Sequence, residues 1–235
     1  MKKLILLLLI YFLLASRGSL FSNDTDLNKY VFHPKAYNSF DMRILLGLSV
    51  ARLPTAIVEE EISFSPMVLA YYRLGLPLNI SMNIQLNSNY ISNNAQAGLK
   101  WTFYDTDLSL SLGANYSLWY GRLKIEGINL ESWGTMFTPN ISAGLDFKQF
   151  LLSVELETQY CWIRTYAEDE SIGTVKRPVA GFGVKIALEQ PLWNNNWLTL
   201  ALKLNYAKFY YQSWLTYSTI DEYFLYPELI VGFVL

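Results

Sequence analysis

Two carboxylates that lie two positions apart, Glu155 and Glu157, have the spacing in this chain that is most suggestive of chemistry. On a β-strand both side chains would point to the same face, about 6–7 Å apart at ~3.3 Å per residue. Paired carboxylates can act as a general acid and a general base. We favour a second interpretation, in which the two carboxylates form ion pairs with lysines in the interior of the fold, because buried charges need partners.

Histidine, the usual general base, occurs once, as His33. It stands beside Pro34 in a polar segment, where we expect a solvated or turn residue. Histidine-dependent catalysis is disfavoured, since no other histidine is present to pair with a serine or an aspartate. The spacings GxSxG, HExxH, CxxC and the phosphate-binding loop are also missing. We therefore predict a protein that is not an enzyme, with no catalytic residue and no cofactor.

Candidate metal ligands are sparse. Cys161 is the single cysteine, which excludes an intrachain disulfide and a cysteine-based metal site. The acidic runs 59–61 and 168–170 could offer oxygen ligands to a divalent cation, but contiguous acids rarely have the required geometry. We interpret both runs as solvated loops and predict no metal site. Lys176 and Arg177 could contact the phosphates of lipid headgroups.

Residues 1–18 have the parts of a secretory signal peptide. Lys2 and Lys3 precede an unbroken apolar run from Leu4 to Leu14, and small residues follow it. This run is too short for a membrane-spanning helix, which needs about 20 residues. Removal of residues 1–18 leaves 15 basic and 20 acidic residues, a formal charge of −5. That balance argues against nucleic acid as a partner.

Residues 23–41 are polar and aperiodic, and we interpret 19–41 as a lead segment on the periplasmic side of a barrel that spans 42–235. From residue 42 onward apolar and polar residues alternate in repeated stretches, as in LNISMNIQLNSNY at 78–90, which is the period of a β-strand with one apolar face. The predicted strands are 42–53, 62–74, 78–90, 95–104, 107–120, 135–147, 150–162, 178–189, 197–210 and 223–235. The count falls from ten to eight if the first strand, or the second and sixth with Pro66 and Pro139, are wrong.

The polar face of these strands decides the fold class. Only 16% of residues are charged, while the chain has 17 Tyr, 13 Phe and 7 Trp. The strands are longer than the usual ~5–6 residues, and short and long links alternate, with the link at 92–94 as an exception. A soluble surface would carry many Lys and Glu on the polar face. Here that face holds small residues and eight balanced charges, which we predict to form a lumen charge network: Arg43, Lys100, Lys185, Lys203, Asp146, Glu155, Glu157 and Glu228. We therefore predict an all-β fold, a transmembrane antiparallel up-and-down β-barrel; the alternative is a secreted soluble barrel.

The signal peptide, the amphipathic strands and the ending YFLYPELIVGFVL resemble the small outer-membrane β-barrel proteins of Gram-negative bacteria, the OmpA- and OmpW-like class in the broad sense. The resemblance covers 42–235 and implies a place in the bacterial outer membrane, with membrane lipids and the barrel-assembly machinery as partners. In that class the last strand alternates apolar residues up to an aromatic final residue, which the assembly machinery reads. The candidate assembly signal here is Leu229, Val231, Phe233 and Leu235, with Leu in place of the final aromatic residue and with Pro227 in the same strand.

Two functions without catalysis stay open. In the one we favour, the barrel is a scaffold, and the predicted long surface loops 121–134, 163–177 and 211–222 serve adhesion to a host surface or ligand binding. In the other, the barrel is a narrow pore or transporter for small solutes. Ten strands enclose little free space, and Trp119 and Trp197 fall on the lumen face, which disfavours a pore.

Overall fold

The computed structural model describes residues 29–55, 63–125, 128–167, 170–192, 196–208 and 222–235. The predicted signal peptide, the acidic run 59–61 and nearly all of the predicted loop 211–222 lie outside these ranges. Within them there is no helix long and apolar enough to cross a membrane.

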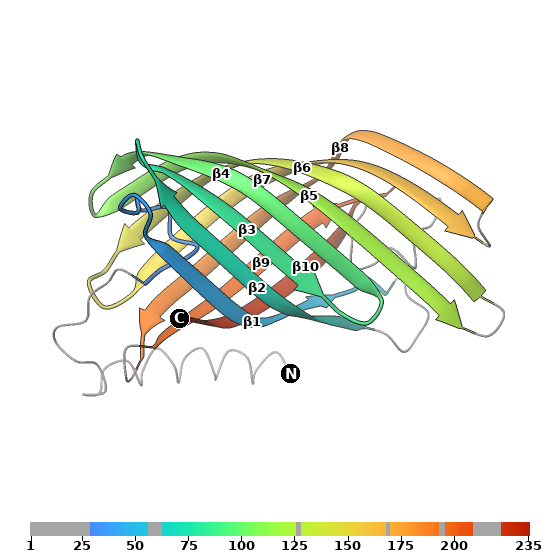
Figure 1. The fold of residues 1–235 in the computed structure, drawn as a ribbon, viewed down its shortest axis with the longest axis horizontal. Coiled ribbons are helices and arrows are strands. Elements are labelled where there is room, and N and C mark those ends of the chain that lie inside the picture. The colour runs from blue at the N-terminus through green and yellow to red at the C-terminus, as the bar shows by residue number, and fades with distance from the viewer. Residues whose placement is uncertain (1–28, 56–62, 126–127, 168–169, 193–195, 209–221) are drawn as a thin grey trace.

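Ten antiparallel strands in the described residues form one closed barrel (Figure 1). Every strand pairs with its neighbours in sequence, and β1 closes the barrel by pairing with β10. This confirms the predicted up-and-down barrel. The strands are β1 Met42–Arg52, β2 Phe64–Leu76, β3 Ile80–Ser88, β4 Ser92–Asp105, β5 Leu108–Ile125, β6 Ile128–Asp146, β7 Leu151–Ala167, β8 Glu170–Pro191, β9 Trp197–Ala207 and β10 Phe224–Val234.

The eight-strand alternative is wrong, because both prolines are accommodated within strands. Pro66 lies opposite Val50 in the β1–β2 ladder. Pro139 lies opposite Ala114 in the β5–β6 ladder, while on its other side the β6–β7 register skips from Phe137 to Asn140. Proline has no N–H to donate, so the ladder is interrupted locally and the strand continues.

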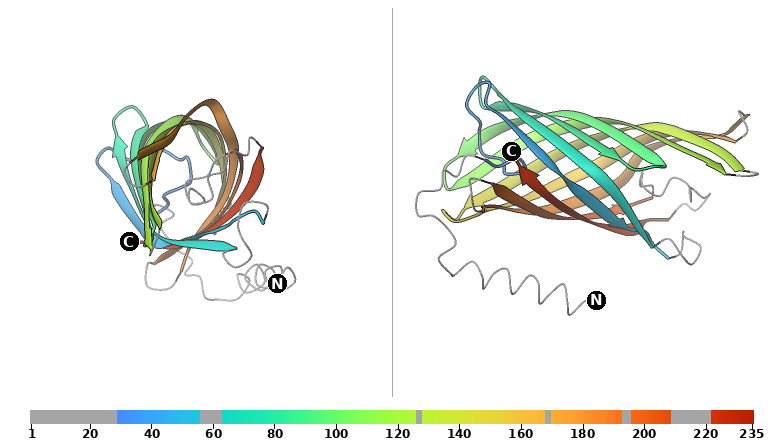
Figure 2. Two further views of the ribbon diagram at one scale, coloured as in Figure 1. Left: turned by 90° about the vertical axis from the view of Figure 1, so that its right-hand side faces the viewer. Right: turned by 60° about the horizontal axis from the view of Figure 1, so that its bottom comes forward.

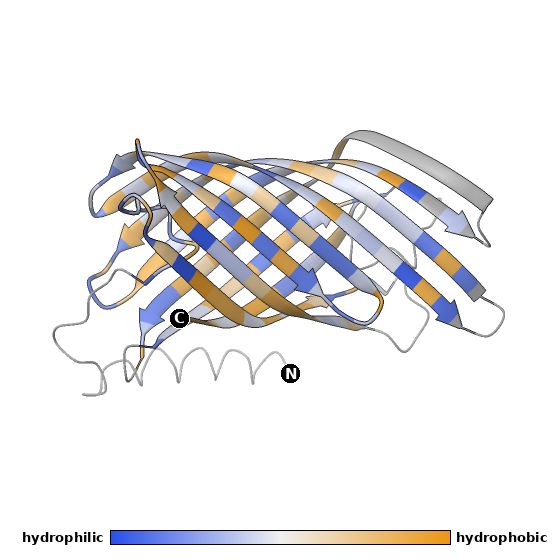
Figure 3. Ribbon diagram, viewed as in Figure 1, coloured by the Kyte–Doolittle hydropathy of each residue, from blue (hydrophilic) through white to orange (hydrophobic). Residues whose placement is uncertain are grey.

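Hydropathy alternates along the strands (Figure 3). The exposed side chains of the strands are mostly apolar and the buried ones mostly small or polar, so the apolar face lies outside and the polar face lines the lumen. In the 78–90 stretch Ser81, Asn83 and Asn87 are buried in the interior, whereas Leu86 on the opposite face is 50% exposed. Leu78, which we expected in the strand, lies instead in the β2–β3 turn. Leu78 and Asn79 have φ values of 64° and 57°, the pair of positive angles of a tight hairpin turn.

The outward surface is a continuous apolar belt with aromatic residues toward its two ends. The half-exposed belt includes Leu46, Leu48, Val68, Leu99, Leu112, Leu118, Leu156, Leu202 and Leu229, and its aromatic members include Trp101, Phe103, Phe147, Tyr116, Tyr160 and Tyr206. An apolar surface of this size would drive aggregation in water, whereas lipid solvates it. The closed ladder also leaves no unpaired sheet edge inside a bilayer. The chain is therefore a transmembrane β-barrel.

The two ends of the barrel differ. At the short-turn end, β1 begins, β10 ends, and the strand pairs β2–β3, β4–β5, β6–β7 and β8–β9 are joined. At the opposite, extended end, β5 to β8 run past the other strands (Figure 1, right side). These four strands have 18, 19, 17 and 22 residues.

Two of the predicted loops are wrong for this reason, since the described residues of 121–134 and 163–177 belong to strands β5 to β8. The β5–β6 ladder continues to Ile125 opposite Ile128, and the β7–β8 ladder continues to Ala167 opposite Glu170. The period of two persists there, but the polar side reverses. Arg122 and Lys124 are exposed, and Leu123 between them packs toward the interior. Beyond the lipid the outside meets water, so the polar residues move to the outer face and the lipid-facing pattern ends.

Candidate functional site

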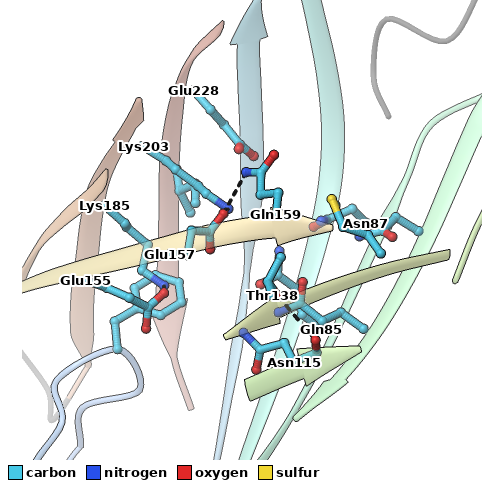
Figure 4. A pocket seen from close by; sticks show the side chains of 15 residues that line it. Gln85, Asn87, Asn115, Thr138, Glu155, Glu157, Gln159, Lys185, Lys203 and Glu228 are labelled. Carbon is cyan, nitrogen blue, oxygen red and sulfur yellow. Dashed lines mark hydrogen bonds and ion pairs between the residues drawn. The ribbon is translucent and has the colours of Figure 1, made fainter. Parts of the chain in front are cut away.

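Three lysines, Lys100, Lys185 and Lys203, form ion pairs with two glutamates in the lumen. Figure 4 shows Lys185 beside Glu155 and Lys203 beside Glu157. Glu155 lies between two ammonium groups: Oε2 is 2.6 Å from Lys100 Nζ, and Oε1 is 2.7 Å from Lys185 Nζ. Glu157 Oε1 is 2.7 Å from Lys203 Nζ. These side chains come from β4, β7, β8 and β9, and the Lys100–Glu155 pair joins β4 to β7 across the lumen.

Hydroxyl and amide groups complete the coordination of the two carboxylates. The Ser142 hydroxyl lies 3.1 Å from Glu155 Oε2 and 3.0 Å from Lys100 Nζ. The Gln159 amide nitrogen donates to Glu157 Oε1 at 2.9 Å and to Asn205 Oδ1 at 3.0 Å. Each carboxylate thus has an ammonium partner and a further polar partner, which is the arrangement of a structural ion-pair network.

The other three members of the predicted network have other partners, and two of them, Arg43 and Asp146, lie away from the ion pairs. Arg43 donates to the carbonyl oxygen of Met42 at 2.7 Å. Asp146 forms an ion pair of 3.4 Å with Lys35. Glu228 accepts a hydrogen bond of 2.6 Å from the Ser49 hydroxyl. The structure therefore brings together five of the eight predicted charges at two glutamates. It places Glu228 beside them, opposite Lys203 in the β9–β10 register and lining the same cavity, and it places Arg43 and Asp146 at separate contacts.

The lead segment is part of the lumen. Residues 29–41, hereafter the plug, lie within the ring of strands near the short-turn end (Figure 2, left). Tyr30, Val31 and Phe32 pack with Leu69, Tyr71, Leu151 and Trp197 of the barrel wall in one buried cluster. His33 is 0% exposed, so the expectation of a solvated histidine is wrong. The apolar run Tyr-Val-Phe inside a polar stretch is the signal that indicates burial.

Glu189 on β8 binds the main chain of the plug. Its Oε1 accepts from the N–H of Val31 at 2.7 Å, and its Oε2 accepts from the N–H of His33 at 2.7 Å. The N–H of Phe32 lies 3.2 Å from both oxygens. A buried carboxylate that accepts from three successive N–H groups forms strong, charge-assisted hydrogen bonds.

Arg73 on β2 supplies the complementary donors. Its guanidinium donates to the carbonyl oxygen of Val31 at 3.2 Å, to that of His33, and to that of Lys35 at 3.0 Å. The Arg73 Cζ atom also lies 4.4 Å from the centre of the Tyr37 ring. Arg73 and Glu189 together hold the plug by its backbone, and hence largely independently of its side chains.

Arg73 and Glu189 are not among the predicted site residues, although the sequence carries a signal for each. Arg73 falls between the outward residues Tyr72 and Leu74, and Glu189 falls four residues after Lys185 on the same face of β8. A count of lumen-face charges carried to the ends of the strands would have included both.

Two glycines of the wall make room for the plug. A Cβ atom on Gly144 would overlap His33 Nε2 and would lie 2.6 Å from Pro34 Cδ. A Cβ atom on Gly75 would overlap the carbonyl oxygen of Asn38 and would lie 2.6 Å from Tyr37 Cβ. Real Cβ atoms do not approach so closely, so the plug fits only because these wall positions carry no side chain.

Burial favours the neutral forms of two ionisable side chains of the plug, His33 and Tyr37. Burial lowers the pKa of His33 to about 3, and the nearby Arg73 charge adds to this effect. Burial also raises the pKa of the Tyr37 phenol well above its usual value. The charges that bind the main chain of the plug are those of Glu189 and Arg73 in the barrel wall.

Little free space remains in the described part of the lumen. The cavity beside the ion pairs, lined by Phe32, Asn94, Glu157 and Gln159 among others, offers about 30 Å³ for the centres of water molecules. At ~10–15 Å³ per water, this is room for about two waters. Toward the extended end, Trp119, Met136, Cys161, Ile163 and Tyr226 belong to a second buried apolar cluster.

The other residues singled out in the sequence are the candidate assembly signal on β10 and the pair Lys176 and Arg177, and they lie apart from the ion pairs and the plug. Leu229, Phe233 and Leu235 point outward at the short-turn end of β10, with Val231 in the same phase, and Pro227 lies opposite Leu204. Lys176 and Arg177 belong to β8, but their side chains lie outside the described residues. No group of three or more His, Cys, Asp or Glu side chains in the ranges described is arranged to hold a metal ion.

Comparisons with known proteins give similarity at the level of the fold. No family model matches the chain, and no curated protein matches it. Among solved structures, Ail, the attachment invasion locus protein of Yersinia pestis, has 7% identity and a TM-score of 0.41, covering 84% of this chain and 100% of its own. CdiB from Acinetobacter baumannii has 12% identity and a TM-score of 0.33, covering 70% of this chain and 31% of its own. A mutant of the Rh. blastica porin has 7% identity and a TM-score of 0.19, covering 83% of this chain and 98% of its own. At these identities the likeness concerns the barrel fold alone.

Proposed function

We propose that this protein is a closed β-barrel of the bacterial outer membrane, and that it acts as a non-conducting scaffold that presents the ends of β5 to β8 to the outside. The filled lumen is the observation that carries this proposal. The plug occupies the short-turn end, the ion pairs occupy the middle, and the apolar cluster around Trp119 occupies the extended end.

The same observation disfavours the alternative of a narrow pore. A solute would have to displace the plug, which Glu189 and Arg73 bind through its main chain. Beyond it the solute would meet paired charges and then buried Trp119. Wide water channels are found in barrels of about 16–18 strands, where side chains leave the centre open.

The extension of β5 to β8 is the surface best suited to meet a ligand or a host surface. It continues past the apolar belt, and its outward residues change from apolar to charged, as at Arg122, Lys124 and Arg164. The short turns, the start of β1 and the end of β10 lie at the opposite end of the barrel. In bacterial outer-membrane barrels the short turns are on the periplasmic side. The extension would then project from the cell.

An epitope inserted between Ile125 and Ile128 tests the location and the orientation. We expect an antibody to label intact cells that carry the epitope, and we expect the unboiled protein from the outer-membrane fraction to migrate differently from the boiled protein. An identical insertion between Phe147 and Phe150, at the short-turn end, is the matched control and should be labelled only after permeabilisation. Labelling of the control alone on intact cells would reverse the orientation.

A trimmed hairpin tests the role of the extension. Gly121 and Ser132 lie directly opposite each other in the β5–β6 register, so Asn-Gly can replace residues 122–131 as a two-residue turn. We expect cells with this variant to lose adhesion to host surfaces while the protein keeps its heat-dependent gel shift. Full adhesion by the trimmed variant would show that this part of the extension is not the interaction surface.

A further inference from the structure

At the extended end of the barrel, cationic side chains lie over aromatic rings on the outward face. The Trp133 and Trp162 rings meet edge to face, with centres 4.9 Å apart. Arg164 Cζ lies 4.7 Å from the centre of the Trp162 ring and 5.6 Å from that of Trp133. On the other side of the barrel, Lys208 Nζ lies 5.0 Å from the centre of the Tyr223 ring.

The short-turn end has outward aromatic pairs without this feature among the described residues. Trp101 pairs with Phe103 at 5.8 Å, and Phe147 stacks on Phe150 at 4.8 Å. The cation–ring contacts near that end involve Arg73 and Lys185 and rings of the plug, all of them inside the lumen. The outward aromatic residues at the extended end therefore have cations beside them, whereas those described at the short-turn end do not. The two ends of the apolar belt would meet the two leaflets of the membrane.

The order of residue types along β5 to β7 follows the layers of a lipid leaflet. Leu118 and Phe137 are exposed members of the apolar belt. Next along the strands come Tyr120, which lies opposite Trp133, and Trp162. Beyond them Arg122 and Arg164 are exposed, and Arg164 lies opposite Trp133 in the β6–β7 register. Acyl chains, the interface and phosphate groups follow one another in the same order.

We propose that the outward patch of Tyr120, Arg122, Trp133, Trp162 and Arg164, hereafter the β5–β7 patch, binds phosphate groups of lipid headgroups in the outer leaflet. This inference rests on the membrane location and orientation proposed above. The two indole rings attract the Arg164 guanidinium through cation–π contacts, and its N–H groups are suited to pair with phosphate oxygens. Glu131, opposite Arg122 in the register, is the acidic residue that faces the patch, and it leaves the patch with a net positive charge.

The test uses the full-length protein in detergent with a diphosphorylated glycolipid (lipid A) as the probe, and native mass spectrometry counts the bound lipid. We expect the wild type to retain lipid A, and Arg164→Gln to bind it at least about tenfold more weakly, as for the loss of one charged hydrogen bond. Lys148→Gln, an exposed lysine in the β6–β7 turn at the other end, is the matched control and should bind as the wild type does.

Two further samples define the ligand. Lipid A without its phosphates should bind no better to the wild type than to Arg164→Gln, and equal retention of both lipids by the wild type would overturn the proposal. Inorganic phosphate at the same concentration should not compete, and full competition would indicate free phosphate as the ligand and overturn the lipid assignment. The heat-dependent gel shift of each sample reports the barrel separately, so a failure of lipid binding is distinguishable from a failure of the proposed function.

Discussion

Replacement of Glu189 by Gln should loosen the plug without a change in the size of the side chain. Glu189 accepts from the N–H groups of Val31, Phe32 and His33 with its two oxygens. Glutamine keeps one oxygen, and its NH₂ group would face an N–H group that also donates. At least one short hydrogen bond is lost, and the negative charge that strengthens the others is lost with it.

The expected magnitude follows from the number of these bonds. Hydrogen bonds to a charged group contribute about 1.5–3 kcal/mol each, and an unsatisfied buried donor adds a further penalty. The loss of about two such contributions makes release of the plug easier by about 3–4 kcal/mol. Since ~1.4 kcal/mol is a factor of ten, the released state becomes roughly 100- to 1,000-fold more populated.

Thiol labelling at position 31 measures that population. Val31 is buried in the plug, and Val31→Cys in a Cys161→Ser background supplies one reporter thiol of similar size. We expect slow maleimide labelling of the folded protein and a rate at least about 100-fold higher in the Glu189→Gln variant, as long as labelling requires opening.

The Glu157→Gln variant is the matched control for this labelling experiment. Glu157 lies in the same lumen and pairs with Lys203, but the plug's main chain bonds to Glu189 instead. The control should label at the rate of the parent protein. An unchanged rate in Glu189→Gln, or an equal increase in both variants, would refute the idea that Glu189 holds the plug.

Three other changes test the interior. Glu155→Gln leaves Lys100 and Lys185 without their shared carboxylate and should lower the free energy of unfolding by about 3–5 kcal/mol in urea titrations; unchanged stability would mean that the ion pairs contribute nothing. Gly144→Val places a side chain where His33 lies, so labelling of the reporter thiol should rise, and a rate equal to the parent's would contradict the fit of the plug. Because burial lowers the pKa of His33 from 6.5 to about 3, its contribution to stability is complete above pH 6.5 and declines as the pH falls toward 3. Because maleimide reacts with the thiolate, each labelling rate is divided by the rate for the unfolded protein at the same pH. This ratio should increase as the pH falls over that range, and the His33→Asn variant should show a flatter dependence on pH.

The barrel was predictable from the sequence because one physical rule governs its transmembrane part. Lipid outside and a polar lumen inside impose a period of two, as in Leu86 outside and Asn87 inside. The extension of β5 to β8 was not predicted, because beyond the lipid the outward residues are polar and the inward ones are apolar. The outward charges Arg122 and Lys124 were therefore interpreted as part of a loop. The same periodicity that defined the strands was still present there.

The plug was not predictable from the same pattern, since its main contacts are made by its main chain. Glu189 and Arg73 bind N–H and carbonyl groups, which every residue except proline offers in full, so the plug sequence carries little trace of them. The pairing of Glu155 with lysines followed from charge balance on one face, whereas the choice of Lys100 and Lys185 depends on how the closed barrel places β4 and β8.

The ionic conductance of the purified, refolded protein in a planar bilayer tests the central claim, a closed barrel, most directly. We predict no steady current for the wild type, because the plug, the Glu155 and Glu157 ion pairs and the apolar cluster around Trp119 fill the lumen. A 16- to 18-stranded porin reconstituted in the same way should conduct and serves as the positive control. A steady current from the pure protein would contradict the closed scaffold and support the narrow pore.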